Sequence, residues 1–175
     1  MNAKRYSPTP WLVASGAIAA IAATVTLVAR DHPEVGTTLA GWATQATWIP
    51  TRHWARHSSY PVLAGVYFLC VWPIALTTAG ATTAALCFPV VIKFGADFTL
   101  GKRAKGVVAL LFFGSAAVAG LAFWDGSDYR GIRFGTSLAD LLAFGWFFFA
   151  AAGVTFTVSL VGLYVCIVHD PKARG

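Results

Sequence analysis

Long apolar stretches alternate along the chain with connecting segments that carry nearly all of its charge. The apolar stretches cover residues 11–29, 61–92, 106–124 and 138–168. A hydrocarbon core about 30 Å thick requires roughly 20 apolar residues of helix, and each stretch meets or nearly meets that length. The pattern predicts an all-α fold, an integral membrane four-helix transmembrane bundle that forms one domain over residues 1–175.

The second and fourth stretches are longer than a membrane crossing requires, each with about 31 residues or roughly 46 Å of continuous helix. The second contains Pro73 and Pro89 on either side of a small, polar centre that begins at Thr77 and ends at Thr83. Proline removes a backbone donor, so this stretch forms either one kinked helix, which we favour, or two shorter segments. Two segments would reverse the sidedness of everything upstream.

The connection between the first two stretches is predicted to contain an amphipathic helix over residues 32–49. Asp31 and Glu34 have the spacing of an N-cap and its N3 partner, Pro33 is tolerated in a first turn, and Pro50 stops the helix. Apolar side chains then recur on one helical face, at Val35, Leu39, Trp42, Ala46 and Ile49.

Tryptophans at Trp42, Trp48 and Trp54 suggest where this helix lies. Indole rings are favoured at the boundary between headgroups and hydrocarbon, so the three residues are candidate interfacial anchors. The alternative is an ordinary packing helix that covers the ends of the spans.

The composition supports a lipid environment. Of the 175 residues, 57% are hydrophobic and 11% are charged, too few to coat a water-soluble globule. A nucleic-acid partner is not expected, because the basic residues form no stripe interleaved with aromatic side chains. Cys70, Cys87 and Cys166 lie within apolar stretches without CxxC spacing, so neither a disulfide framework nor a thiolate metal site is expected.

The distribution of Lys and Arg predicts the orientation of the spans. Eight of these residues lie in the N-terminal segment, in residues 93–105 and in the C-terminal tail, and five lie in the other two connections. The positive-inside rule then places both termini in the cytoplasm, with the chain in a bacterial inner membrane. The first apolar stretch exceeds a usual signal-peptide core, so we expect a retained span rather than a cleaved leader.

His53 and His57 come closest to a pair of metal ligands. Four residues apart on a helix, both imidazoles would point the same way. Arg52 and Arg56 flank them, and two fixed cations oppose a divalent metal, so we expect solvated histidines and no bound metal. Haem is not expected either, because no two histidines lie mid-span on facing helices.

Asp140 is the ionisable residue nearest the interior of a span. Intramembrane carboxylates are costly and often belong to proton or cation pathways. Ser137 and Asp140 also have N-cap to N3 spacing, so the carboxylate can instead bond the first turn of the fourth span near the interface. We favour this capping role.

The basic cluster Lys102, Arg103 and Lys105 lies in the connection after the second stretch and is expected to contact lipid phosphate. Asp97 in the same connection has no second carboxylate beside it, so general acid and base chemistry is not indicated. Small residues four apart, among them Ala116 and Gly120, favour close approach of helices in lipid.

These observations lead to a functional prediction. With no catalytic motif and no soluble domain, the chain is expected to be a non-enzymatic subunit or scaffold of a larger membrane complex, such as a secretion, conjugation or energy-transducing assembly. Its partners would be the lipid bilayer and other membrane subunits or further copies of itself, and no cofactor is expected. The alternative is a small oligomeric transporter or channel that uses Asp140 and the kink between Thr77 and Thr83.

Overall fold

The computed structural model describes residues 7–46, 49–86 and 99–167, and the predictions that rest on Trp48, Pro89 and Asp97 lie outside these ranges. The described helices are α1 (Thr9–Asp31), α2 (Pro33–Gln45), α3 (Thr51–Trp54), α4 (Pro61–Val71), α5 (Ile74–Ala85), α7 (Leu100–Phe123) and α8 (Leu138–Ile167). Among these residues the only strand pairing is a single bridge between Tyr129 and Ile132. The prediction of an all-α chain is confirmed.

Four helical segments are long and apolar enough to cross a membrane: α1, α4 together with α5, α7, and α8. The predicted spans are therefore confirmed, with shifted boundaries. α7 begins at Leu100 rather than at residue 106 and so includes Lys102 and Lys105. Lysine stems are long enough to carry their ammonium groups out to the interface, so these charges do not end the helix.

The second span bends at Trp72 and Pro73, between α4 and α5. Both residues keep right-handed helical angles, and the Ala75 amide donates to the Trp72 carbonyl at 3.0 Å. Proline has no amide to donate, so the helix tightens at this point and changes direction. Over the described residues 61–86 the favoured kinked helix is confirmed, but the bend lies at Pro73, and residues 77–83 form regular helix inside α5.

The predicted cap of the first connection is wrong. Asp31 is the last residue of α1, and its carboxylate accepts a hydrogen bond from Arg30 Nε at 2.9 Å. His32 takes the N-cap position of α2, with no side-chain hydrogen bond to the first turn. Because α1 continues through Asp31, the turn between the two helices falls one residue later than the spacing suggested.

α2 packs against α1 and α4 through small residues. Gly36 and Ala43 are buried, and a Cβ on Gly36 would lie 3.0 Å from the Ala29 carbonyl oxygen. The larger residues Val35 and Trp42 are exposed. A helix in this connection is confirmed, but it ends at Gln45 rather than at residue 49, and a separate short helix, α3, follows. The face of α2 that packs on the bundle is the small-residue face.

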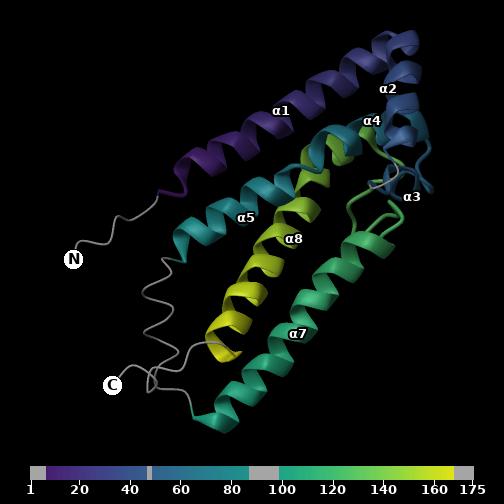
Figure 1. Cartoon of the computed structure of the whole chain (residues 1–175). Coiled ribbons are helices and arrows are strands. Elements are labelled where there is room, and N and C mark those ends of the chain that lie inside the picture. Colours follow the sequence, from purple (N-terminus) through teal and green to yellow (C-terminus); the bar gives the residue numbers. More distant parts are fainter. Residues whose placement is uncertain (1–6, 47–48, 87–98, 168–175) are drawn as a thin grey trace.

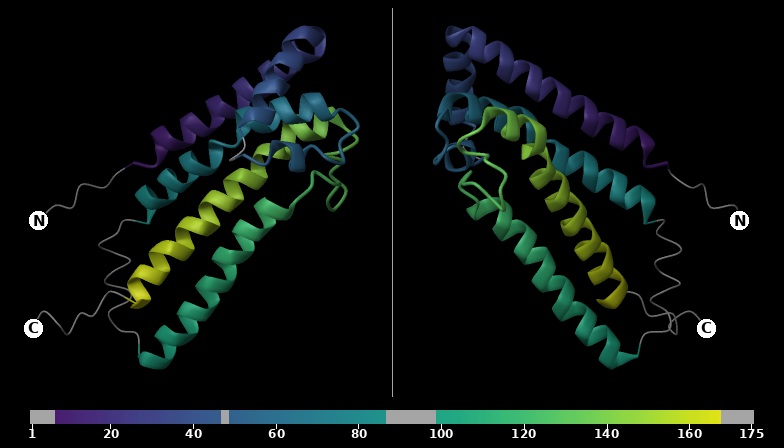
Figure 2. Two further views of the ribbon diagram at one scale, coloured as in Figure 1. Left: turned by 45° about the vertical axis from the view of Figure 1, so that its right-hand side comes forward. Right: turned by 180° about the vertical axis from the view of Figure 1, so that it is seen from behind.

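The spans lie side by side in a row (Figures 1 and 2). α1 packs on α4 and α5, α5 packs on α8, and α7 packs chiefly on α8. α2, residues 49–60 and residues 124–137 lie together at one end, which we call the capped end. α1 begins, α5 ends, α7 begins and α8 ends at the opposite end, so the spans alternate in direction along the chain.

Candidate functional site

The capped end is held together by hydrogen bonds from the first connection to the end of α7 and to the connection that follows it, about 70 residues later in the sequence. Trp54 Nε1 donates to the Leu121 carbonyl at 2.7 Å, and the Ser59 amide donates to the Gly135 carbonyl at 2.8 Å. Gly126 has a φ of +79°, and a Cβ there would overlap the Trp54 carbonyl oxygen. Only glycine suits this approach, both because of its backbone angle and because of the missing Cβ.

Aromatic rings fill the space beneath these connections. Trp54 is 3% exposed and meets Phe149 and Phe68 edge-on at centroid distances of 5.0 and 5.8 Å. Trp124 stacks on Phe148 at 4.4 Å. The predicted anchors therefore differ in their surroundings: Trp54 is a core residue with a satisfied indole, whereas Trp42 is 59% exposed.

His53 and His57 have separate partners. His53 Nε2 lies 3.2 Å from the Phe123 carbonyl oxygen, and His57 Nδ1 lies 3.0 Å from Asp125 Oδ2. Hydrogen bonds from Ser127 hold the pKa of the Asp125 carboxyl below its usual value, and the charge of His57 adds to this effect. The described residues include no group of three or more potential metal ligands. His53 joins the first connection to the end of α7, and His57 joins it to the connection that follows α7.

Asp128 organises the turn before α8 and was missed from the sequence. Its carboxylate accepts from the Gly135 amide at 2.9 Å and from Thr136 Oγ1 at 3.2 Å. The signal available was the density of turn-forming residues between Asp125 and Thr136. Nearby, Tyr60 donates its hydroxyl to the Phe134 carbonyl, and burial with the negative charges of this turn raises the pKa of Tyr60 to about 12.

Asp140 lies in the first turn of α8, at the capped end. Ser137 Oγ accepts from the Asp140 amide at 3.2 Å, as the N-cap spacing suggested. The Asp140 carboxylate does not reach the first-turn backbone; it accepts from the Arg133 amide at 3.0 Å, with Arg133 Nε at 3.7 Å. It thus fixes the preceding turn and has a cationic neighbour.

The threonines of α5 satisfy their hydroxyls locally. Thr78, Thr82 and Thr83 donate to carbonyls one turn back in the same helix, at 2.7 to 2.8 Å. Thr77 also lies 2.7 Å from Ser15 Oγ of α1, which joins two spans. These side chains stabilise helix and helix contact, and they do not converge on a shared site.

The basic cluster lies at the end of the molecule opposite the capped end. Lys102 and Lys105 are exposed in the first turns of α7, and Arg103 is half-buried. Thr99 caps this helix by accepting from the Lys102 amide. The structure therefore separates this cluster from His53, His57 and Asp140.

Apolar grooves run along α7. One of about 530 Å³ lies between α7 and α8 and includes Ala116, Gly120 and Ala151. Others of about 430 and 590 Å³ flank the same helix pair. α7 itself has no buried residue, although Gly114 allows it to approach Ser159 of α8 closely.

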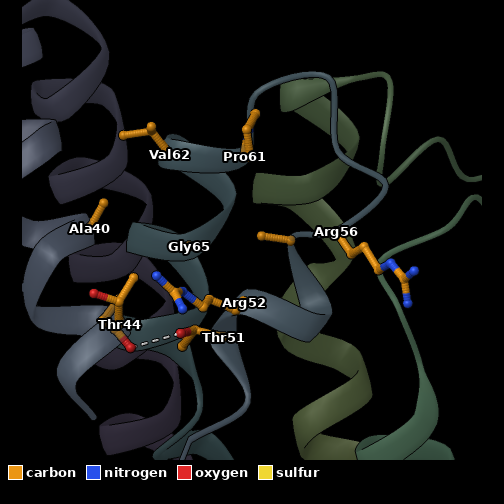
Figure 3. A pocket seen from close by; sticks show the side chains of 10 residues that line it. Ala40, Thr44, Thr51, Arg52, Arg56, Pro61, Val62 and Gly65 are labelled. Carbon is orange, nitrogen blue, oxygen red and sulfur yellow. Dashed lines mark hydrogen bonds between the residues drawn. The ribbon is translucent and has the colours of Figure 1, made fainter. Parts of the chain in front are cut away.

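A smaller cavity of about 260 Å³ lies at the capped end between α2, α3 and α4 (Figure 3). Most of its lining is apolar and small, including Ala40, Ala43 and Gly65. Arg52 and Arg56 line it from α3 and the following turn. Figure 3 shows the Arg52 guanidinium beside Thr44 and Thr51, whereas Arg56 extends away on the other side.

Comparison with known protein families, with curated proteins and with solved structures finds no match to this chain.

Proposed function

We propose that this chain is a non-enzymatic, multi-span subunit of a larger membrane assembly, in which another membrane-spanning helix packs beside α7. The observation that carries the proposal is that α7 is apolar beyond the basic residues of its first turns and yet buries none of its residues against the rest of the chain. Within a bilayer, lipid alone can cover such a surface, so a partner helix is favoured over lipid only where the surface also has a suitable shape.

The grooves beside α7 have the shape that helix association in lipid requires. Ala116 and Gly120 are small residues one turn apart, and Ala151 faces them from α8. Small side chains let a second helix approach closely and gain van der Waals contact, because no hydrophobic force drives apolar helices together in lipid. A partner helix is therefore better accommodated here than on a surface of large side chains.

The surroundings of Asp140 and the α5 threonines support a subunit over a transporter. Asp140 lies at the capped end beside Arg133, and Thr78, Thr82 and Thr83 direct their hydroxyls to their own helix. A transport path needs polar groups that face a common conduit near the membrane centre. Among the described residues, neither the Asp140 carboxylate nor these threonine hydroxyls face a common conduit of this kind.

The test is gentle detergent extraction of the tagged chain, followed by quantification of co-purifying polypeptides. We expect a partner at fixed stoichiometry that is lost with Ala116→Phe, which fills the groove. Ala109→Phe is the matched control, because Ala109 is exposed on α7 outside the grooves. A chain that purifies alone as a monodisperse oligomer and conducts ions in vesicles would replace the proposal with the transporter alternative.

We further propose that both chain ends face the cytoplasm, on the strength of the Lys and Arg distribution. Single cysteines at Ser59 and Ser127, in a cysteine-free background, should react with an impermeant thiol reagent added outside the cell. A cysteine at Thr99 should react only after the membrane is opened. Labelling of Ser59 and Thr99 from the same side would be incompatible with four spans.

A further inference from the structure

Five arginines lie at the capped end, and their side chains differ in what they contact. Three have partners: Arg30 pairs with Asp31 at 2.9 Å, Arg133 with Asp140 at 3.7 Å, and the Arg130 guanidinium lies 5.3 Å from the centre of the Tyr129 ring. The side chains of Arg52 and Arg56 have no hydrogen bond, ion pair or ring contact to any described residue. These two positive charges are uncompensated within the described chain.

Both uncompensated arginines line the same cavity, the one of about 260 Å³ between α2, α3 and α4. Within the described chain, the residues that line it include no carboxylate. The hydroxyls of Thr44 and Thr51 donate to the Gly41 and Ala43 carbonyls, so they offer no free proton to a ligand. The cavity thus combines small apolar walls with a rim whose fixed charge is positive.

We propose that this cavity binds one anionic phospholipid. The phosphate lies on the Arg52 guanidinium, whose planar fork matches two phosphate oxygens, and the first part of an acyl chain enters between α2 and α4. Arg56 strengthens the local positive potential from the opposite side of the turn. The cavity volume is several times the roughly 30 Å³ that one water molecule occupies in the liquid. The cavity therefore has room for several methylene groups of an acyl chain.

A lipid fits the cavity better than free phosphate does, because the walls are apolar. Ala40, Ala55 and Val62 offer a phosphate ion no hydrogen bond, whereas they suit a hydrocarbon chain. The residues that line the cavity belong to α2, α3 and the first turns of α4, where the second span meets its connection. Headgroups surround a spanning protein at this depth. Charge and apolar volume therefore select an amphiphile with an anionic head.

The test measures the dissociation constant of phosphatidylglycerol on the purified full chain in detergent, by native mass spectrometry, with phosphatidylcholine as reference. We expect a one-to-one complex that prefers phosphatidylglycerol. Arg52→Gln should raise the dissociation constant about fivefold, the effect of one arginine at an anionic lipid headgroup. Arg130→Gln removes the same charge at the same end but outside the cavity, and it should change the constant less than twofold.

Two results would overturn the headgroup part of the proposal. Equal losses in Arg52→Gln and Arg130→Gln would indicate diffuse surface attraction instead of a site. Binding of inorganic phosphate at the same concentrations as the lipid would indicate a free anion as the ligand.

The acyl part has its own variant. A Cβ on Gly65 would meet no atom within 4 Å, so Gly65→Leu can fill the cavity without a clash at its Cβ. It should weaken phosphatidylglycerol binding although Arg52 is intact. Gly41→Leu, also without close neighbours at its Cβ and outside the cavity lining, is the matched control. Unchanged lipid binding in Gly65→Leu would show that no acyl chain enters, and the proposal would fail.

Discussion

α4 and α7 are apolar helices of the same chain with opposite surroundings. α4 buries most of its residues, including Tyr67, Phe68 and Val71, beneath the connections of the capped end. α7 is longer and buries none. Hydropathy treats the two helices alike, because lipid and protein interior are equally apolar solvents. The difference teaches that, in this protein, the neighbours of a helix decide whether its apolar side chains serve the core or the outer surface.

The connections explain most of this difference. α3 and Tyr60 lie immediately before α4, and the hydrogen bonds of this segment to residues 121–135 hold α4 against the aromatic rings of the capped end. α7 reaches the other spans chiefly through α8. α7 therefore has one main neighbour, whereas α4 contacts α1, α2, α3 and α8.

The largest expected effect is the loss of a core ring in α4. Phe68 is 1% exposed and meets the rings of Trp54, Trp124 and Phe149. Phe68→Ala should lower the free energy of unfolding by about 3–5 kcal/mol, because it leaves a cavity among rigid rings. Phe112→Ala on α7, where the ring is 66% exposed, should cost less than about 1 kcal/mol. Thermal unfolding in detergent measures both, and equal losses would remove the contrast between the helices.

The second prediction concerns the junction above α4. Gly126→Ala forces a Cβ onto the Trp54 carbonyl and disfavours the positive φ, so it should cost about 2–3 kcal/mol. Gly131 also has a positive φ, +86°, but a Cβ there would meet no atom within 4 Å. Gly131→Ala should therefore cost only the backbone term, about 1–2 kcal/mol. If Gly131→Ala proves as damaging in the same unfolding assay, the close approach of the two connections is not what requires Gly126.

The third prediction is a loss of stability at high pH that originates at Tyr60. Its pKa in the folded chain is about 12, above the value near 10 of a free tyrosine, so the folded state holds this proton more tightly. The stabilisation is complete below pH 10 and is lost as the pH rises towards 12. Because the side chain is partly exposed, we expect about 1 kcal/mol or less. Unfolding measured from pH 9 to 12 should show this decline, and Tyr60→Phe should flatten it.

The smallest effect is expected at Asp140. Asp140→Asn keeps an acceptor for the Arg133 amide and loses only the charge beside Arg133, so it should cost at most about 1 kcal/mol. Assembly with partners should survive. An ion flux in vesicles that the wild-type chain supports and Asp140→Asn abolishes would contradict this structural role in the turn before α8 and favour transport.

The amino-acid sequence alone determined the four spans, because the hydrocarbon thickness sets a length that any apolar helix must meet and that local composition reveals. It also predicted a kinked second span, since the missing amide of Pro73 acts on its own helix. The first connection was harder: Asp31 and Glu34 have capping spacing, but α1 extends through Asp31 and leaves the cap to His32. Two helices competed for one residue, and local pattern does not decide such competition.

Only the tertiary structure decided which polar groups meet at the capped end. His57 and Asp125, like Trp54 and Leu121, are nearly 70 residues apart, and their pairing depends on how the spans align. Nothing near these residues in the sequence indicates their distant partners. The sequence therefore predicted Trp54 as an interfacial anchor, whereas the fold buries it in the core. The physical reason is that spans form independently in lipid, from length and hydropathy, whereas contacts between them depend on the packing of all the helices together.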